Sequence, residues 1–542
     1  MKAICQTGSF EAFSMYNAIY VDKTELIYSL VSLPNRIFIS RPRRFGKSLT
    51  LDTIATLFET GVEPYFKGTW IYDKWTEPTY PVLRLNFLNF DKNSLEKFNN
   101  KLNSKITEFA ELNQVTTYKE KEEAEDSIDH LLEQLRLENR QIVILIDEYD
   151  CQMTANINNE TLYKQFQEKI KSFYANLKDK LAIKFLGITG VTRLKDVSIF
   201  SVGSDINDIT NASAYSQMIG FTRDEIKKYY IDYLTLAASY ENNCTVDNVT
   251  EAQIESLLDR LAKNYYGYCF DEFYKKKVFS TWSVNKFFKS VVSNKFVYFG
   301  EYWYDNGGLP SILVNYLKTH ELNIFDYLDK DKSLKVTDDD FKNPTALTSM
   351  NQNVLMCQTG YLTLSSALTS GDLTVDLGIP NGEIYKALNR LLANNIFKGN
   401  TDITDDYGRS LLEVGTVDDI INLFNSALNS VSYDNYPIVS ESSVQNMLKL
   451  YLLGAHQKVL SEVHEAKGRA DLVVNTDNRR IVFEFKYAKN ETEAKSKLLD
   501  AVEQIKTRDY GNIVPKKTEL LRIAAVFNAD PKVRAFTEFQ LV

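Results

Sequence analysis

Three side chains near the C-terminus, Asp471, Glu484 and Lys486, could do chemistry together. They belong to two alternating apolar runs that a polar stretch, 475–480, joins, which predicts a β-hairpin. Because residues two apart in a strand share a face, Glu484 and Lys486 point the same way, and Asp471 can face them from the partner strand. Two carboxylates and a lysine in one place can hold a divalent ion and position a water. The alternative is a surface hairpin with an ordinary cross-strand salt bridge.

The elements predicted around this hairpin would hold it between two helices. The residue pattern predicts a helix over 441–453, a strand over 458–463, the two hairpin strands, and a helix that begins near Glu491. That order, αβββα, resembles the core of the PD-(D/E)xK nuclease superfamily, and the resemblance covers about residues 436–530. It implies a restriction-endonuclease-like domain that hydrolyses nucleic acid with Mg²⁺.

The resemblance also implies roles for single residues. Glu441 matches the carboxylate of the superfamily's first helix, Asp471 and Glu484 match its metal ligands, and Lys486 matches its catalytic lysine. Gln504 matches a glutamine often found in the second helix. Carboxylate oxygens suit Mg²⁺, and a lysine near the ion can stabilise charge on the phosphate. The four histidines of the chain are scattered, so we expect no zinc site.

A second site is predicted at the other end of the chain. A short apolar strand, 36–40, leads through the loop RPRRFGKS, 41–48, into a helical run, 49–58. Strand, loop and helix in that order are the context of a Walker A motif. The motif departs from the usual pattern at one position, because Arg41 stands where the first glycine is expected.

The loop residues have the types that phosphate binding needs. Gly46 would expose backbone N–H groups at a helix N-terminus, Lys47 would place a positive charge at the β- and γ-phosphates, and Ser48 would offer a hydroxyl to Mg²⁺. The nucleotide contacts predicted in the loop are Arg43, Arg44, Phe45, Gly46, Lys47, Ser48 and Leu49.

A Walker B motif is predicted where the continuous apolar run 142–146 ends in Asp147 and Glu148. Such a run is typical of a buried parallel strand with acidic residues at its carboxyl end, where ligands bind in α/β folds. Asp147 would hold Mg²⁺ through water, and Glu148 would activate water against the γ-phosphate. The alternative is a buried strand that ends in two capping acids.

A further apolar strand, 182–188, is followed by Thr189 and Arg193. P-loop ATPases with an additional strand carry a polar sensor of the γ-phosphate at this place, so we predict that Thr189 is that sensor. Arg193 is a candidate charge-sensing arginine, and a surface salt bridge is the alternative for it.

Several segments together resemble the AAA-ATPase-like family of bacterial proteins, whose members often carry a C-terminal PD-(D/E)xK domain. They are residues 20–24, 40–48, 146–150, 188–193 and 282–284. In that family the first P-loop glycine is commonly replaced by arginine, so Arg41 does not argue against a working site. The resemblance runs through nearly the whole chain and implies ATP and Mg²⁺ as ligands.

Length and composition agree with a multidomain protein of the cytoplasm. A chain of 542 residues is long enough for more than one domain. No apolar run approaches the roughly 20 residues that cross a membrane, so we expect no membrane partner. Five widely spaced cysteines suggest reduced thiols. The net charge is −9, but the nuclease-like segment is mildly basic, which suits a phosphate backbone. The sequence leaves the oligomeric state open.

The predicted fold class is a multidomain α/β protein: a P-loop ATPase with a parallel sheet, a helical and winged-helix middle region, and the αβββα domain. The predicted parts are a core over 1–235, a helical lid over 236–330, a winged-helix-like region over 331–400 and the nuclease-like domain over 436–542. Winged-helix modules bind DNA or pack as a lid, and the acidic run 338–340 favours the lid. Linkers are predicted near 399–406 and 430–437.

Three functions are consistent with these motifs. The first is an ATP-binding and ATP-hydrolysing protein coupled to a Mg²⁺-dependent nuclease that acts in defence or in DNA processing. The second is a signalling ATPase whose inactive nuclease-like domain only binds nucleic acid or a protein partner. The third is a P-loop phosphotransferase with a structural appendage. The intact Asp471, Glu484 and Lys486 favour the first over the second, and Glu148 favours hydrolysis over phosphotransfer. Because a free nuclease would be toxic, we expect the ATPase to gate it.

Overall fold

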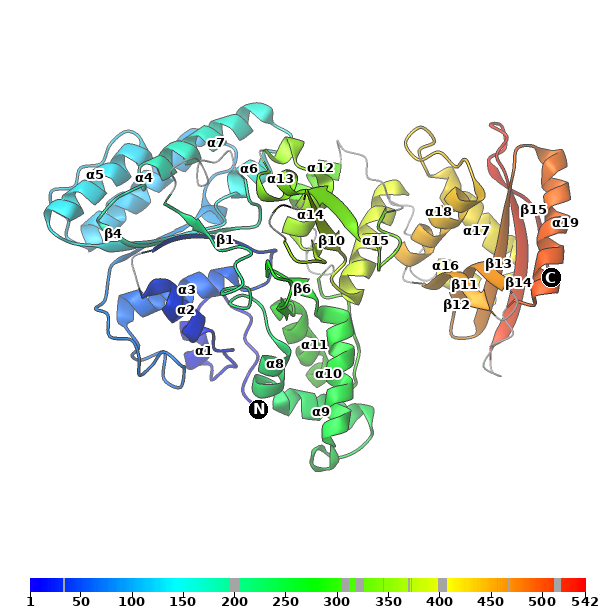
Figure 1. Ribbon diagram of the computed structural model, residues 1–542, viewed down its shortest axis with the longest axis horizontal. Coiled ribbons are helices and arrows are strands. Elements are labelled where there is room, and N and C mark those ends of the chain that lie inside the picture. The colour runs from blue at the N-terminus through cyan, green and yellow to red at the C-terminus, as the bar shows by residue number, and fades with distance from the viewer. Residues whose placement is uncertain are drawn as a thin grey trace. The chain divides into compact units, whose positions relative to one another are not determined.

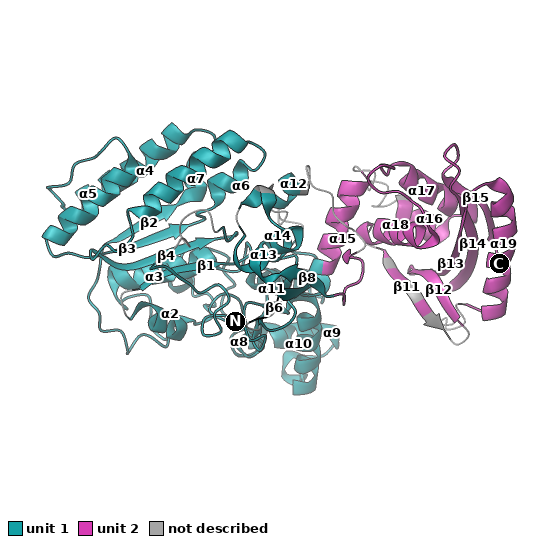
Figure 2. Cartoon of the chain, turned by 45° about the horizontal axis from the view of Figure 1, so that its top comes forward, with its two compact units in different colours: residues 1–320, 333–384 teal, residues 321–332, 385–542 magenta. Residues whose placement is uncertain are grey.

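The computed structural model divides the chain into two compact units, coloured separately in Figure 2. Unit 1 consists of residues 1–320 and 333–384, and unit 2 of residues 321–332 and 385–542. Unit 1 holds the predicted core, most of the predicted lid and the first part of the predicted winged-helix region, and the four-part division stays a prediction. The residues that the structure describes are 1–32, 35–194, 205–303, 311–317, 326–344, 346–368, 371, 373–397, 407–455, 457–465, 468–510 and 518–542.

A five-stranded parallel sheet forms the centre of unit 1. Its strand order is β2-β3-β4-β1-β5, so strands distant in sequence become neighbours through crossover helices. Every residue of β3 and β4 is buried, as expected of central strands covered on both faces. The strands are β1 (Asn35–Ser40), β2 (Val82–Asn86), β3 (Ile142–Asp147), β4 (Ile183–Gly190) and β5 (Asn207–Asp208).

Helices cover both faces of this sheet, with α4, α5 and α7 on one side and α1 to α3 on the other (Figure 1). Side-chain caps begin the two longest of them: Ser94 accepts from the amide of Lys97 in α4, and Asn159 accepts from that of Leu162 in α7. The helices are α1 (Glu11–Met15), α2 (Thr24–Val31), α3 (Lys47–Thr60), α4 (Leu95–Leu112), α5 (Ala124–Leu137), α6 (Cys151–Ala155) and α7 (Glu160–Ala175).

A helical region follows the sheet along the chain. A capping box formed by Thr222 and Glu225 begins α8. Aromatic residues of this region are buried together in one apolar core that includes Tyr230, Tyr265 and Phe288. The elements are α8 (Arg223–Tyr229), α9 (Ile231–Glu241), α10 (Glu251–Tyr265), β6 (Tyr268–Cys269), β7 (Lys277–Val278) and α11 (Thr281–Asn294).

The remainder of unit 1 contains a three-stranded antiparallel sheet in the order β8-β10-β9, with a helix before its hairpin, as predicted for a winged-helix-like region. The helix before the hairpin, α14, buries Val354, Leu355 and Met356. Gly360 ends it with φ +91°, and a Cβ there would lie 2.8 Å from Pro42 Cβ, so this turn packs on the P-loop. The elements are α12 (Ser311–Leu317), β8 (Leu334–Thr337), α13 (Asp338–Lys342), α14 (Gln352–Thr359), β9 (Thr363–Leu364), β10 (Thr374–Gly378) and α15 (Gly382–Ile396), which continues into unit 2.

Unit 2 has a five-stranded mixed sheet in the order β11-β12-β13-β14-β15. The order α18, β11, β12, β13, α19 confirms the predicted αβββα core, and β14 then pairs parallel to β13. Other elements are α16 (Tyr407–Val414), α17 (Val417–Asn429), α18 (Glu441–Gly454), β11 (Lys458–Glu465), β12 (Gly468–Asn475), β13 (Arg479–Ala488), α19 (Glu491–Arg508), β14 (Glu519–Asn528) and β15 (Ala535–Leu541).

Some boundaries differ from the prediction. The hairpin turn is shorter than 475–480, because Asn475 and Arg480 pair across the strands. Strand β4 is longer than 182–188, because Thr189 and Gly190 continue the ladder with β1. The predicted linker 430–437 lies in turns between α17 and α18, whereas the linker 399–406 falls outside the described residues.

Candidate functional site

The P-loop joins β1 to α3 by a turn that only special backbone conformations allow. Arg44 has φ +69° and Gly46 has φ +110°, both in the left-handed region. A Cβ on Gly46 would meet nothing within 4 Å, so the backbone angle, not space, requires glycine there. Gly46 is the N-cap of α3, which leaves the N–H groups of the first turn open to an anion.

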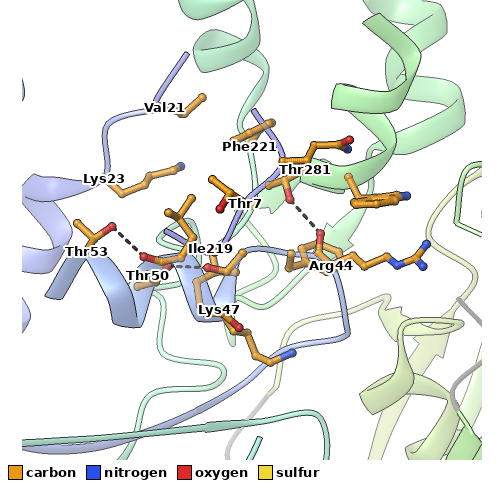
Figure 3. Close-up of a pocket in the computed structure, with 18 of the residues that line it drawn as sticks. Thr7, Val21, Lys23, Arg44, Lys47, Thr50, Thr53, Ile219, Phe221 and Thr281 are labelled. Carbon is orange, nitrogen blue, oxygen red and sulfur yellow. Dashed lines mark hydrogen bonds between the residues drawn. The ribbon is translucent and has the colours of Figure 1, made fainter. Parts of the chain in front are cut away.

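A cavity of about 470 Å³ opens beside this loop (Figure 3). It is lined by all seven P-loop residues predicted to contact nucleotide and by Glu148. Lys47 is nearly buried, and its ammonium donates to the carbonyls of Arg41 at 3.0 Å and Pro42 at 3.3 Å. A fixed cation thus lies where the phosphate-binding lysine was predicted.

Asp147 connects Ser48, the other predicted metal-binding residue of this site, to Thr189, the predicted sensor. The Ser48 hydroxyl donates to Asp147 Oδ2 at 2.6 Å, and the Thr189 hydroxyl donates to Asp147 Oδ1 at 2.5 Å. Strand order explains the meeting, because the strand leading to Ser48 and the strands carrying Asp147 and Thr189 are adjacent in the order β3-β4-β1. The structure brings these side chains together, and their roles with ATP and Mg²⁺ stay predictions.

Glu148 lies just beyond β3 with a left-handed backbone, φ +53°. Its Oε1 is 3.9 Å from the Lys47 ammonium. Burial raises the pKa of Glu148, Lys47 opposes that rise, and the neighbouring Asp150 and Asp147 carboxylates add to it. A carboxylate with a raised pKa beside the lysine predicted to bind phosphate has the chemistry to accept the proton of water.

The position of the Arg41 side chain shows why the loop tolerates arginine where the first glycine is expected. Its side chain is buried away from the cavity, with the guanidinium 4.1 Å from the ring centroid of Phe270. Nη1 donates to the carbonyls of Ser40 at 2.8 Å and Thr210 at 2.6 Å. Burial lowers the pKa of Arg41 to about 9. The side chain therefore anchors the base of the loop and leaves the phosphate side clear.

Arg44 and Phe45 face the helical region more than the phosphate side. The guanidinium of Arg44 lies 4.5 Å from the ring centroid of Trp282, and its carbonyl accepts from the Thr281 hydroxyl at 2.9 Å (Figure 3). Phe45 is buried in edge contact with Tyr268, at 4.7 Å between centroids. Of the two predicted arginines, Arg43 has no such partner among its described contacts and lines the cavity.

Arg193 does not line the cavity. Its Nε lies 2.5 Å from Asp208, its Nη1 donates to the carbonyl of Lys342, and its amide donates to Gln358 Oε1 at 3.1 Å. The salt bridge considered as the alternative is thus present. The hydrogen bonds to Lys342 and Gln358 direct Arg193 toward α13 and α14. A charge-sensing role for Arg193 stays a prediction.

The far end of the cavity was not found by sequence reasoning. Apolar side chains form it, and Figure 3 shows Val21 and Phe221 at the opposite end from Lys47. The neighbouring Lys23 is held by Glu225 at 2.6 Å and by the Gln217 carbonyl at 2.7 Å. The residues that line the cavity outside the P-loop include Thr7, Phe13, Ile19, Val21, Ile219, Phe221 and Asn285. Only the family-like segments 20–24 and 282–284 gave any signal for it.

In unit 2, the predicted hairpin places Asp471, Glu484 and Lys486 on one face. The register pairs Leu472 with Phe483, so Asp471 is level with Glu484 on the next strand. The Lys486 ammonium lies 2.8 Å from Glu484 Oε1 and 3.5 Å from Glu441 Oε1 at the start of α18. The four predicted residues therefore meet at one place.

Asp471 has two donors that fix its carboxylate. Oδ2 accepts from the Phe485 amide at 2.8 Å, and the side chain of Gln445, one helical turn after Glu441, also donates to Asp471. Sequence reasoning missed Gln445, which lies four residues from Glu441 and so on the same face of the helix. Gln504 instead donates to the Tyr510 hydroxyl at 3.2 Å.

The charges of this cluster perturb one another. Burial and the nearby Asp471 raise the pKa of Glu484 to about 7. Burial also raises the pKa of Asp471, against the Phe485 and Lys486 contributions. The pKa of Lys486 is raised, because its hydrogen bond to Glu484 and the surrounding carboxylates outweigh the effect of burial.

These residues fit a divalent cation. Among the described residues Glu484 Oε2 is buried without a hydrogen-bond partner, and two carboxylates with raised pKa values lie side by side, an arrangement that a cation would relieve. Within the described part of the chain, no three His, Cys, Asp or Glu side chains are gathered as a complete ligand set. Two carboxylates suffice for Mg²⁺, which keeps several waters or phosphate oxygens.

Comparisons with known proteins match two parts of the chain to family models. Residues 5–200 match the family model described as a predicted AAA-ATPase, and residues 439–536 match that of the PD-(D/E)XK nuclease superfamily. These matches confirm the two resemblances, and the chain combines an AAA-ATPase-like domain with a PD-(D/E)XK nuclease superfamily domain.

A relative covers nearly the whole chain. It is an uncharacterised protein in the vnfD 5′ region of Azotobacter chroococcum mcd 1, 26% identical over 530 residues, which are 95% of this chain and 93% of that protein. Among solved structures, Cdc6p from Pyrobaculum aerophilum aligns with 11% identity and a TM-score of 0.22, over 68% of this chain and 92% of that one. Within the described residues, none of the helices is long and apolar enough to cross a membrane.

Proposed function

We propose that this protein binds and hydrolyses ATP and that its C-terminal domain cleaves nucleic-acid phosphodiester bonds with Mg²⁺. The observation that carries the proposal is the meeting of Lys47, Ser48, Asp147 and Glu148 beside the cavity. Defence against foreign nucleic acid and DNA processing are the settings that this pair of activities would serve.

The cavity supports ATP as the ligand at the P-loop. Lys47 and the open N–H groups of α3 would bind the β- and γ-phosphates. Ser48 and Asp147 would hold Mg²⁺, and Glu148 would take the proton of the attacking water. The apolar far end, with Val21 and Phe221, would take the flat base, since such pockets bind ligands largely through apolar contact.

The carboxylate cluster supports phosphodiester hydrolysis in unit 2. Asp471 and Glu484, with Glu441 nearby, would hold Mg²⁺, which when bound neutralises phosphate charge and lowers the pKa of water. Lys486, 2.8 Å from Glu484, would stabilise the charge that develops on the phosphate. The mildly basic composition of this domain supports a nucleic-acid substrate.

The test uses the full-length protein with Mg²⁺, with supercoiled plasmid and with RNA, in the presence and absence of ATP. Lys47→Ala should abolish ATP binding, and Glu148→Gln should retain binding and lose phosphate release. Asp471→Asn and Lys486→Ala should each lower cleavage by roughly a hundredfold or more, as for loss of a group that acts in the transition state. Binding of ATP by Lys47→Ala at wild-type affinity would refute the P-loop assignment.

One outcome would favour the second function instead. If wild type hydrolyses ATP but cuts neither plasmid nor RNA, while both Asp471→Asn and wild type bind nucleic acid equally, the domain is a binding module. The ATPase would then serve signalling.

A further inference from the structure

Glu148 has an unusual backbone for a residue with a side chain. Its φ of +53° places it in the left-handed region, which disfavours L-residues other than glycine, asparagine and aspartate by about 1 kcal/mol or more. Such a conformation persists only where surrounding contacts enforce it. The two residues that follow Glu148 supply contacts of this kind.

Tyr149 fastens the turn after β3 to the end of β4. Its amide donates to the Thr189 carbonyl at 3.1 Å. Its hydroxyl donates to the Thr192 carbonyl at 3.0 Å and accepts from the Leu194 amide at 3.2 Å. The ring is fully buried, and a Cβ on Gly190 would lie 2.4 Å from it, so β4 passes directly over the ring.

Asp150 fastens the same segment with its carboxylate. Oδ2 accepts from the Thr192 amide at 2.7 Å, the Thr192 hydroxyl at 2.5 Å and the Val191 amide at 3.3 Å. Asp150 is 1% exposed, and these donors all come from the residues just after Thr189. A buried carboxylate satisfied in this way holds its donors in one geometry.

We infer that Tyr149 and Asp150 are positioning residues for ATP hydrolysis, an inference that rests on the proposed function. Neither residue lines the cavity, so they act through their neighbours. They hold Glu148 in its left-handed conformation beside Lys47, and they hold the end of β4 so that the Thr189 hydroxyl stays on Asp147. Loss of the contacts made by Tyr149 and Asp150 lets Glu148 leave its left-handed conformation, which moves the proton acceptor out of place.

Thr192 offers the sharpest test, because it can be changed with and without its hydroxyl. Thr192→Val keeps the shape and removes the hydroxyl donor to Asp150, whereas Thr192→Ser keeps that donor. We expect kcat for ATP to fall roughly tenfold to a hundredfold in Thr192→Val, in line with loss of a hydrogen bond to a charged group. The Kd for ATP should stay within about twofold, and Thr192→Ser should restore kcat.

Two further variants, one of them with a matched control, keep the inference falsifiable if Thr192→Val folds poorly. Asp150→Asn should lower kcat at unchanged Kd. Tyr149→Phe, which keeps the ring over Gly190, should do the same, while Tyr174→Phe should match wild type. Tyr174 is a suitable control because it is also buried and its hydroxyl has no hydrogen-bond partner within the described structure.

The outcomes separate this inference from the proposed function. Wild-type kcat in Thr192→Val, Asp150→Asn and Tyr149→Phe would overturn it, while ATP hydrolysis by wild type would leave the proposed function intact. A fall in kcat, ATP affinity and unfolding temperature together, without rescue by Thr192→Ser, would show a structural role and also overturn it. A wild-type protein that does not hydrolyse ATP would overturn both.

Discussion

Asp471 and Glu484 differ in how their oxygens are satisfied. Asp471 receives donors from Phe485 and Gln445, whereas Glu484 has one oxygen on Lys486 and one buried oxygen that no described residue donates to. An oriented carboxylate beside an unsatisfied one is suited to ligate an ion, since groups that hold a ligand in place contribute to its affinity. Substitution of Gln445 therefore tests whether orientation of the Asp471 carboxylate contributes to ion binding.

We predict that Gln445→Leu weakens binding of Mg²⁺ or Mn²⁺ by roughly tenfold, the usual scale for loss of an outer-shell partner. The measurement is isothermal titration calorimetry of the full-length protein without nucleotide. Gln504→Leu is the matched control, because Gln504 donates to Tyr510 and not to the carboxylates. Equal affinities in wild type and Gln445→Leu would show that Gln445 does not support the ion.

Among the secondary-structure elements, both sites depend on the backbone geometry where strands end and on how neighbouring strands pair. The P-loop is a strand-to-helix junction made by left-handed residues, and Glu148, directly after β3, is itself left-handed. In unit 2, the register of β12 and β13 puts the carboxylates on one face, and a slip by one residue would turn Asp471 away from Glu484. Function here depends on backbone geometry as much as on side-chain type.

We predict that Gly46→Ala destabilises unit 1 by about 1–2 kcal/mol, the cost of a left-handed alanine, and also weakens ATP binding. Gly68→Ala is the control, because Gly68 has φ +86° with no described atom within 4 Å of the added Cβ and does not line the cavity beside the P-loop. Both variants should lose similar stability in urea denaturation, while only Gly46→Ala loses ATP affinity. A similar loss of ATP affinity in both variants would mean that the loss does not come from the backbone geometry of the P-loop.

At the scale of the whole molecule, α15 begins in unit 1 and continues into unit 2. Its first turn carries Glu383, which is 2% exposed and accepts from the Ser283 hydroxyl at 2.7 Å and the Trp303 amide at 2.8 Å. Burial raises the pKa of Glu383 to about 8, although both hydrogen bonds oppose the rise. A carboxyl that is protonated near neutral pH thus lies where the chain leaves unit 1.

This pKa predicts a pH dependence of stability. Between about pH 4.5, where the unfolded side chain ionises, and about pH 8, the folded state binds the extra proton. The free energy of unfolding should therefore fall as pH rises through that window. Glu383→Gln should flatten the slope, and exposed Glu133→Gln should not. Tryptophan fluorescence is a clean readout, because all four tryptophans lie in unit 1. An unchanged slope in Glu383→Gln would show that Glu383 does not cause the pH dependence of stability.

We also predict that nucleotide state controls the nuclease. A ligand shifts an equilibrium only through different affinities for two states, so ATP, ADP and no nucleotide should give different cleavage rates. Glu148→Gln, which binds ATP without turnover, should hold the rate at its ATP value. Cleavage assays at saturating nucleotide measure this directly. Equal rates in all conditions would leave two independent activities in one chain.

The sequence by itself determined the local parts of both sites. Alternation fixed the faces of Asp471, Glu484 and Lys486, and an unbroken apolar run identified β3 with its two acids. These are properties of neighbouring residues, since side-chain direction in a strand follows directly from position. The order of elements along the chain could be predicted for the same reason.

Only the tertiary structure decided which distant residues meet. It placed Arg41 on Thr210 and Phe270, gave the cavity an apolar end from segments about 200 residues apart, and chose Gln445 over Gln504 as the partner of Asp471. It also set Glu148 in a left-handed conformation held by contacts with the end of β4. Such contacts depend on packing between elements, and one sequence pattern is compatible with many packings until the core selects one.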